Sequence, residues 1–182
     1  MLLEVDQDPD IRVLVITGTG KAFCSGGDVS GMGSGSGGGP VRSHQDKVRT
    51  LQQKQQELTL RLHELSKPTI AALPGAAAGA GMSIALACDL RIAAEDAFLA
   101  PGFNRVGLSG DYGASWFLNR LVGPARAKEL FFTGRRVQSE EAHALGLFNE
   151  VVAFDDLAER THELAGQIAN GQPVAIRYMK QN

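Results

Sequence analysis

Two short apolar runs, each followed directly by a turn signal, restrict the fold of this chain more than any other feature of its sequence. Residues 11–17 (IRVLVIT) and 69–73 (TIAAL) are almost unbroken runs of β-branched and aliphatic residues. Such runs are typical of strands that are buried on both faces, as in a parallel sheet. Gly18 follows the first run and Pro74 follows the second. We therefore expect two buried strands, each leading directly into a loop.

The remaining sequence alternates between helical and extended patterns. Apolar residues at positions 48, 51, 58, 62 and 65 have helical spacing, and residues 79–88 are small or apolar on every side, which suits a fully buried helix. Further strands are expected over residues 89–93, 97–99 and 148–152, and further helices over 113–121, 124–132, 139–145 and 156–169. Strands that alternate with helices indicate the α/β class with mostly parallel pairing. The length of 182 residues suits one domain that spans residues 1–182.

Charge and hydropathy argue against nucleic-acid and membrane partners. The chain has 18 basic and 20 acidic residues, so no basic surface for nucleic acid is expected. The uncharged stretch 68–88 is long enough to cross a bilayer, but Pro74 and three glycines interrupt it, so a buried segment of a soluble protein fits better. The first residues lack the basic and apolar regions of a signal peptide, and Cys24 and Cys88 are the only cysteines. These features indicate a reducing compartment, and we expect the cytoplasm.

Several common cofactor and catalytic motifs are absent from the sequence. The segment 18–21 (GTGK) lacks the spacing of a phosphate-binding loop, and the glycines of residues 75–81 do not match the dinucleotide-binding fingerprint. No serine stands in a G-x-S-x-G elbow, and the four histidines lack metal-ligand spacing. We therefore expect no metal site.

Three glycine-rich segments are the candidates for chemistry: residues 23–28 (FCSGGD), 74–81 (PGAAAGAG) and 107–113 (GLSGDYG). Small residues let a ligand approach backbone N–H groups closely, and a helix N-terminus adds unpaired donors and the positive end of the helix dipole. Two converging N–H groups would make an oxyanion hole, which stabilises negative charge that develops on a carbonyl oxygen. The alternative interpretation is that these residues only permit tight packing of strands against helices.

The chain resembles the crotonase (enoyl-CoA hydratase/isomerase) superfamily over nearly its whole length, in the order and spacing of the blocks VLVITGTGKAFCSGGDV, KPTIAALPGAAAGAGMSIALACDLRIAAEDAFLAPGFNRVGLSGDYGAS and LVGPARAKELFFTGRRVQSEEAHALGLFNEVV. The resemblance implies an α/β fold made of a crotonase-like spiral of ββα units with surrounding helices. It implies an acyl-CoA thioester as substrate, with no cofactor beyond the coenzyme A that the substrate carries. It also implies that the N–H groups of Gly27 and Ala80 stabilise a thioester enolate.

The resemblance also bears on the type of reaction. Family hydratases carry two glutamates that activate water, and this sequence has Ser83 at the first of those positions and Gly102 or Phe103 at the second. Asp111 matches the acid of several family isomerases, and the block around it is most similar to the ring and double-bond isomerases of phenylacetyl-CoA breakdown. The resemblance therefore favours an isomerase with Asp111 as the acid/base. A C–C bond hydrolase, a thioesterase, a non-catalytic acyl-CoA binder and a purely structural Asp111 that caps the next helix stay open.

The remaining expectations concern substrate contacts and assembly. The candidate contacts with the substrate are Cys24, Ser25, Gly26, Asp28, Gly79, Ser83 and Tyr112. Ser83 either lines the acyl pocket or bonds to its own helix. Family members assemble as trimers or dimers of trimers and are longer than this chain, so the resemblance predicts a homotrimer or hexamer once an opening hairpin and C-terminal helices are supplied. The segment Gly31–Gly39 is expected to form a flexible loop beside the site.

Overall fold

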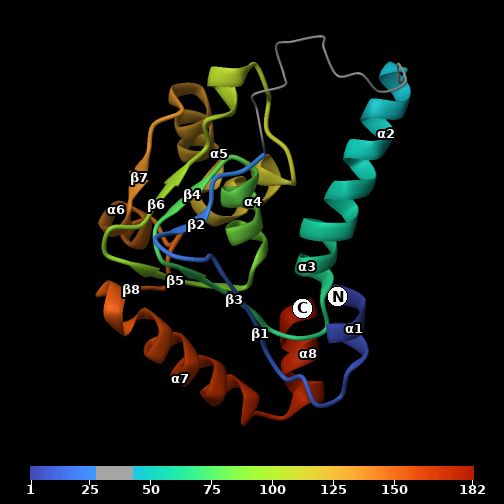
Figure 1. Ribbon diagram of the computed structural model, residues 1–182, viewed down its shortest axis with the longest axis vertical. Helices are drawn as coiled ribbons and strands as arrows, with labels where there is room; N and C mark the ends of the chain where they lie inside the picture. Colours follow the sequence, from blue (N-terminus) through green and yellow to red (C-terminus); the bar gives the residue numbers. More distant parts are fainter. Residues whose placement is uncertain (28–42) are drawn as a thin grey trace.

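The computed structural model describes residues 1–27 and 43–182, and Figure 1 shows their arrangement. The predicted flexible loop Gly31–Gly39 and the predicted contact Asp28 lie outside the described residues. The eight strands are β1 (Leu14–Thr17), β2 (Ala22–Cys24), β3 (Thr69–Leu73), β4 (Ala76–Ala78), β5 (Leu90–Ala94), β6 (Phe98–Ala100), β7 (Val137–Gln138) and β8 (Glu150–Val152) within the described chain. The helices are α1 (Leu2–Gln7), α2 (His44–Gln55), α3 (Arg61–Glu64), α4 (Ala80–Ala87), α5 (Ala114–Thr133), α6 (Ser139–Ala144), α7 (Leu157–Ala169) and α8 (Pro173–Gln181).

The strands form two four-stranded sheets, and the first six strands alternate between them. The first sheet has the order β1-β3-β5-β8 and is parallel throughout. The second has the order β2-β4-β6-β7, parallel except for the last pair. Each of the first three strand pairs is followed by helical structure, so the chain repeats a ββα unit, as the resemblance predicts. Figure 1 shows β2, β4 and β6 side by side, above β1, β3 and β5.

The buried strand predicted over residues 69–73 is confirmed, because all five residues of β3 are buried. One face of β3 contributes Ala71 and Leu73 to the main core, and the other contributes Ile70 to a second core cluster beneath α7. The predicted buried helix is also confirmed: α4 is short, and most of its residues are buried, with Ser83 among them.

The prediction that residues 11–17 form a strand buried on both faces is wrong. The strand β1 begins at Leu14 and lies at the edge of its sheet, and its residues alternate between partly buried and exposed, with Val15 39% exposed. A continuous apolar run does not distinguish an edge strand from a central one, because only tertiary packing decides which faces are covered.

Most of the other expected elements are present with shifted boundaries. The single helix expected around residues 48–65 is α2 and α3 joined by the π-helical turn η1 (Gln56–Leu60). Gly123, with φ 75°, separates the two halves of α5, as the two helices predicted there require. The short elements α1, β2, β4, β7 and α8 are absent from the sequence-based prediction, because two to three residues carry no readable period and the chain ends carry no tertiary signal.

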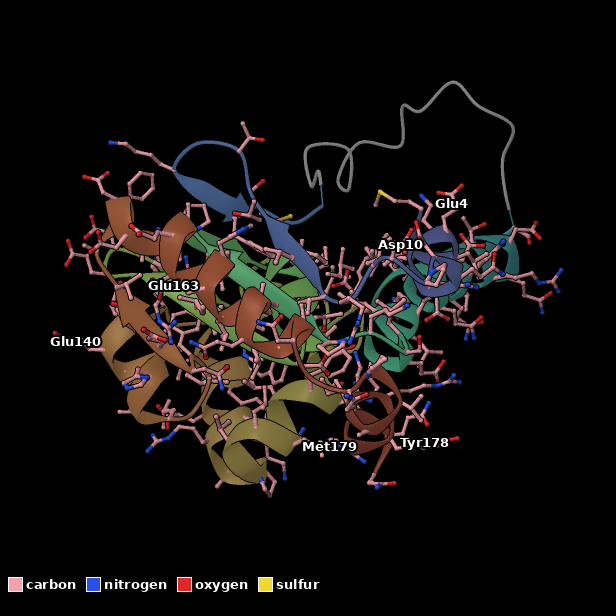
Figure 2. All side chains as sticks on the ribbon, turned by 90° about the horizontal axis from the view of Figure 1, so that it is seen from below. Glu4, Asp10, Glu140, Glu163, Tyr178 and Met179 are labelled. Atoms are coloured by element: carbon pink, nitrogen blue, oxygen red, sulfur yellow. The ribbon has the colours of Figure 1, made fainter. Side chains whose placement is uncertain are left out.

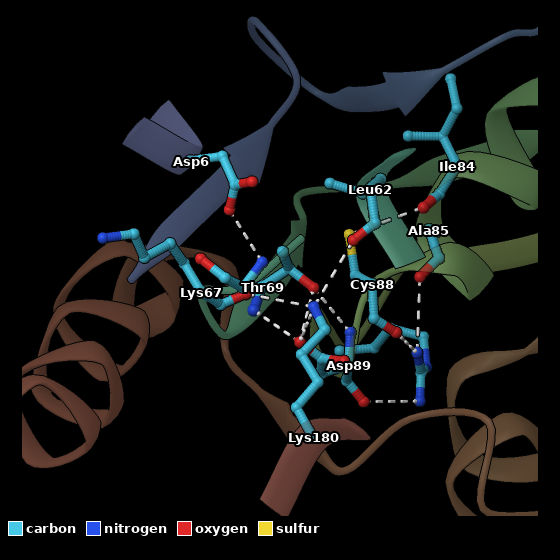
Figure 3. A network of polar contacts seen from close by, with 11 residues as sticks. Asp6, Leu62, Lys67, Thr69, Ile84, Ala85, Cys88, Asp89 and Lys180 are labelled. Atoms are coloured by element: carbon cyan, nitrogen blue, oxygen red, sulfur yellow. Dashed lines mark hydrogen bonds and ion pairs between the residues drawn. The ribbon is translucent and has the colours of Figure 1, made fainter. Parts of the chain in front are cut away.

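A polar network fastens the start of β3 to the start of β5 and to α8 (Figure 3). The Oδ2 atom of Asp89 accepts hydrogen bonds from the backbone N–H and the hydroxyl of Thr69, at 2.8 and 2.9 Å. The Nζ atom of Lys180 lies 2.7 Å from the same oxygen and donates to the carbonyl of Lys67 at 3.1 Å. Lys180 is therefore an ammonium group that is nearly covered and fully paired, which ties α8 to the main sheet.

Arg91 binds the C-terminal end of α4. Its guanidinium is buried and donates to the carbonyls of Cys88 and Leu147, both at 2.6 Å. The last carbonyls of a helix lack partners within the helix, so this cation supplies a donor where the negative end of the helix dipole lies. Burial also raises the pKa of the Cys88 thiol to about 12, so the thiol stays protonated at neutral pH.

The outer surface carries both acidic and large apolar side chains. In Figure 2 the acidic side chains Glu140 and Glu163 project from α6 and α7, and Tyr178 and Met179 project from α8. Among the described residues, no helix has the length and apolar character needed to cross a membrane.

The contact between α4 and β2 predicts opposite effects for two glycine substitutions. A Cβ atom on Gly81 would lie 2.2 Å from the carbonyl oxygen of Cys24, which is backbone and cannot move aside cheaply. We expect Gly81→Ala to lower the free energy of unfolding by about 1–3 kcal/mol. Gly166, on the exposed side of α7, has nothing within 4 Å of such a Cβ. Gly166→Ala should therefore raise stability by up to about 1 kcal/mol.

Urea unfolding of the two variants and the wild type measures both effects. Wild-type stability in Gly81→Ala would contradict the close packing of α4 against β2, whatever the result for Gly166→Ala.

Candidate active site

A cavity of about 160 Å³ opens at the carboxyl ends of β2, β4 and β6. These strands are parallel neighbours, so the segments that follow them meet at one edge of the sheet. The cavity is lined by Ser25, Gly26, Gly27, Ala78, Gly79, Ala80, Pro101, Gly102, Phe103, Val106, Leu108 and Asp111. Residues of all three glycine-rich segments therefore line one cavity.

Glycines at the ends of β2 and β4 allow the two backbones to touch. Gly26 has φ 90°, and a Cβ on it would lie 2.8 Å from the carbonyl oxygen of Ala78 and 3.3 Å from the nitrogen of Ala80. Gly79 has φ 52° and turns the chain from β4 into α4. A side chain at either position would be strained, and at Gly26 it would also clash. The approach of residues 26–27 to residues 79–80 thus depends on glycine.

The N–H group of Ala80 lies at the start of α4, where backbone donors have no partner within the helix. The N–H of Gly79, one residue earlier, donates to the carbonyl of Ala100 at 2.9 Å and is therefore occupied. Gly27 is exposed on the same cavity wall. Ala80 and Gly27 are thus two small residues on the cavity, and their backbone N–H groups are the candidate donors to an anionic oxygen.

Asp111 reaches the cavity from a loop with an unusual backbone. Gly107, Gly110 and Gly113 have φ values of 71°, 114° and 78°, and Tyr112 has φ 48°. Tyr112 is the one residue other than glycine with positive φ among the described residues. The N-cap of α5 is Gly113, so Asp111 does not cap this helix. Glycine adopts a positive φ readily, but at Tyr112 it costs about 1–3 kcal/mol, and strained residues of this kind are concentrated at functional sites.

The carboxyl group of Asp111 is partly removed from water. Its Oδ1 atom is buried and has no hydrogen-bond partner among the residues that the structure describes. Burial raises the pKa of this carboxyl above its usual value, against a smaller lowering by the residue's own backbone N–H. A carboxylate with increased proton affinity and a free oxygen beside a cavity is suited to accept a proton from a ligand.

Ser83 lies beneath the cavity and not on its wall. Its side chain is fully buried, and its hydroxyl donates to the backbone carbonyl of Asp111 at 3.0 Å. The same hydroxyl lies 3.3 Å from the carbonyl of Gly79, four residues earlier, the contact expected of a serine bonded to its own helix.

The structure therefore brings together six of the residues singled out in the sequence, namely Ser25, Gly26, Gly27, Gly79, Ala80 and Asp111. Cys24 ends β2, where its carbonyl and its Cβ atom face Gly81 of α4. Tyr112 is partly exposed and is not among the residues that line the cavity.

A second hollow, of about 380 Å³, lies between the start of α5 and the helical segment formed by α2, η1 and α3. Trp116, Phe117 and His63 form an aromatic wall, in which the ring centroid of Trp116 is 5.0 Å from that of Phe117 and 4.9 Å from that of His63. Gly113 also lines this hollow, two residues after Asp111. Sequence reasoning missed it, since aromatic residues on a helix usually belong to a core and His63 is isolated in the sequence.

Comparison with known proteins identifies the family. The family model described as enoyl-CoA hydratase/isomerase matches residues 1–182. The chain belongs to the enoyl-CoA hydratase/isomerase family. The fold shared with solved family members confirms the predicted α/β crotonase-like architecture: the chain matches the crystal structure of an enoyl-CoA hydratase from Bacillus anthracis with a TM-score of 0.88 and 34% identity, covering 99% of this chain and 67% of that one.

The curated relatives include enzymes named for different reactions. The 1,2-epoxyphenylacetyl-CoA isomerase of Escherichia coli is 35% identical over 180 residues, which are 99% of this chain and 67% of the relative. The short-chain-enoyl-CoA hydratase of Clostridium acetobutylicum is 33% identical over 184 residues, covering 98% of this chain and 66% of the relative. The chain thus spans about two thirds of the length of these relatives, and their names include both an isomerase and a hydratase.

The raised pKa of Asp111 predicts a pH-dependent effect on stability. The folded protein binds a proton at this carboxyl more tightly than the unfolded chain does, so ionisation costs stability as the pH rises above the usual Asp pKa of about 3.9. Asp111→Asn should therefore have a higher melting temperature than the wild type at neutral pH. Below that pKa both states are protonated and the gain should vanish.

Thermal unfolding at neutral and at acidic pH tests this expectation, with the exposed Asp10→Asn as the matched control. A lower melting temperature for Asp111→Asn at neutral pH would contradict the conclusion that burial destabilises the ionised Asp111 carboxylate.

Proposed function

We propose that this protein is an acyl-CoA isomerase that moves a double bond, or isomerises a ring, through a thioester enolate. The observation that carries the proposal is that Asp111, whose buried Oδ1 atom has no hydrogen-bond partner among the described residues, lines the same cavity as Gly27 and Ala80. A base and an oxyanion site are the two elements that proton abstraction next to a carbonyl requires.

In the proposed reaction the thioester oxygen lies against the N–H groups of Gly27 and Ala80. Asp111 takes a proton from one carbon of the acyl group, and the electron pair of the broken C–H bond moves through the conjugated system onto the thioester oxygen. The enolate then collapses, and protonated Asp111 returns a proton to another carbon. The double bond has moved, no atom is gained or lost, and no cofactor is used beyond the coenzyme A of the substrate.

The raised pKa of Asp111 supports this role. A base is most effective when its pKa lies nearer the working pH, because its conjugate acid then returns the proton readily. Desolvation moves the Asp111 pKa in that direction.

Hydration of a double bond is less well supported by this cavity. Activation of water needs a group that can handle its proton, and Asp111 is the one carboxylate among the residues that line the cavity. The two positions that hold glutamates in family hydratases are here a buried serine, Ser83, and the pair Gly102 and buried Phe103.

We further propose that the acyl group extends toward the aromatic hollow at Trp116, Phe117 and His63. Gly113 borders that hollow and Asp111 borders the cavity, so a substrate that reaches both would pass along the start of α5. Self-association as a trimer or a dimer of trimers is a proposal that rests on family resemblance. A location in the cytoplasm is a proposal that rests on the two free cysteines.

Replacing the carboxylate tests the assigned acid/base. We expect Asp111→Asn to lower kcat for isomerisation of a 3-enoyl-CoA by about 10²–10⁴-fold, the usual contribution of a positioned general base. The conversion is followed by the ultraviolet absorbance of the conjugated product, with Asp10→Asn as the control. Isomerisation at the wild-type rate in Asp111→Asn would rule out the proposal.

The same panel of thioesters separates the alternatives. Release of free coenzyme A from a saturated acyl-CoA would favour a thioesterase, and hydrolysis of a carbon–carbon bond of the acyl group, with its thioester left intact, would favour a hydrolase. Binding of every thioester with turnover of none would favour a non-catalytic binder.

The oxyanion site is tested at the backbone. Proline removes the N–H of Ala80, and proline is well tolerated at the first position of a helix. Ala80→Pro should lower kcat by about 10²–10³-fold, the cost of losing one oxyanion donor. Ala80→Gly keeps the N–H and should retain activity. Equal rates in the two variants, both folded by circular dichroism, would show that this N–H plays no part.

A further inference from the structure

The geometry points to Ser83 as a positioning residue for Asp111: its buried hydroxyl fixes the backbone carbonyl of Asp111 and so sets the place of the carboxylate relative to the oxyanion site. This inference rests on the proposed function. Ser83 is not among the residues that line the cavity, so it would not contact the substrate and would act through Asp111.

The carbonyl of Asp111 is held from two directions. The hydroxyl of Ser83, on α4, donates to it at 3.0 Å, and the N–H of Ala114, on α5, donates to it at 3.0 Å. A carbonyl oxygen has two lone pairs, so both are used. The loop that carries Asp111 is thereby fastened to one helix on each side.

Fixing the backbone matters because little else holds the carboxylate. Oδ1 of Asp111 has no hydrogen-bond partner among the described residues, and the residue's own N–H is the hydrogen bond that lowers its pKa. Among the described residues no other side chain is hydrogen-bonded to the carboxylate, so the anchored part of residue 111 is its backbone. That backbone precedes Tyr112 in a left-handed conformation, which persists only if its surroundings enforce it.

Ser83 also contacts the other half of the site. Its N–H donates to the carbonyl of Gly79 at 3.1 Å, and its hydroxyl oxygen lies 3.3 Å from the same carbonyl. Gly79 immediately precedes the proposed oxyanion donor Ala80. One fully buried residue thus links the turn that presents the oxyanion site to the loop that presents the base. The side chain has no exposed surface, so its hydroxyl bonds to protein and not to bulk water.

The experiment compares two buried serines that each bond to a distant carbonyl. Ser83→Ala removes the bond to Asp111, and Ser139→Ala removes the equivalent bond from the Ser139 hydroxyl to the carbonyl of Glu95, outside the site. Both variants lose one buried hydrogen bond, so similar falls in melting temperature are expected. Ser83→Cys keeps a group of similar size with a weaker donor and supplies a milder variant should Ser83→Ala fold poorly.

We expect Ser83→Ala to lower kcat for isomerisation by about 10–100-fold relative to Ser139→Ala with little change in KM, because a base misplaced by about 1 Å costs up to about 10²-fold. Ser83→Cys should fall between Ser83→Ala and the wild type. Release of the loop lets water reach the carboxylate, so the acidic limb of the pH–rate profile should move to lower pH in Ser83→Ala and stay in place in Ser139→Ala.

A double variant separates this inference from the function on which it rests. If Ser83 acts through Asp111, then Ser83→Ala should cause no further loss of kcat in the Asp111→Asn background. Wild-type kcat and an unshifted pH profile in Ser83→Ala, with Asp111→Asn inactive, would overturn the positioning role alone. Wild-type isomerisation in Asp111→Asn would overturn the proposed function instead.

Discussion

Where β2 and β4 end, two backbones approach so closely that the chain has no room for a side chain at Gly26. This approach brings the start of α4 against the end of β2, and Gly81 completes it one residue after Ala80. The cavity and the position of α4 both follow from it. A site assembled from backbone in this way constrains residue size far more than residue chemistry, which explains why half of the residues that line it are glycine or alanine.

Beside this backbone the site places a carboxylate, Asp111, whose charged form is destabilised by burial. Burial desolvates the Asp111 carboxylate, and no cation of the described residues compensates it, so its pKa rises and its ionised form costs stability. Elsewhere the buried charges are satisfied: Arg91 donates to backbone carbonyls, and Lys180 is paired with Asp89. Arg91 and Lys180 therefore serve the stability of the fold, whereas the uncompensated carboxylate of Asp111 is a candidate for a functional role.

Much of this arrangement could be predicted from the sequence, and the exceptions have physical causes. The strand 69–73 and the helix that follows it were readable, because their residues are apolar on all sides. Asp111 was recognisable from family resemblance. The strands β2 and β4 were not, since three residues in a glycine-rich context carry no period. The bond from Ser83 to Asp111 could not be predicted either, because its acceptor is a backbone carbonyl placed by the left-handed conformation at Tyr112, and side-chain patterns do not encode that. Burial of β1 was predicted wrongly because an apolar run does not reveal an uncovered edge.

The tie between Lys180 and Asp89 has a consequence for how the protein opens. Lys180 belongs to the last helix of the chain, yet its ammonium group lies beside the first residue of β3, a strand at the centre of the fold. Detaching α8 would leave the carboxylate of Asp89 without its cation where β3 and β5 begin. No residue of α8 is buried, so this ion pair is what couples the helix to the central sheet, and release of α8 is expected to leave a charge unpaired beside β3.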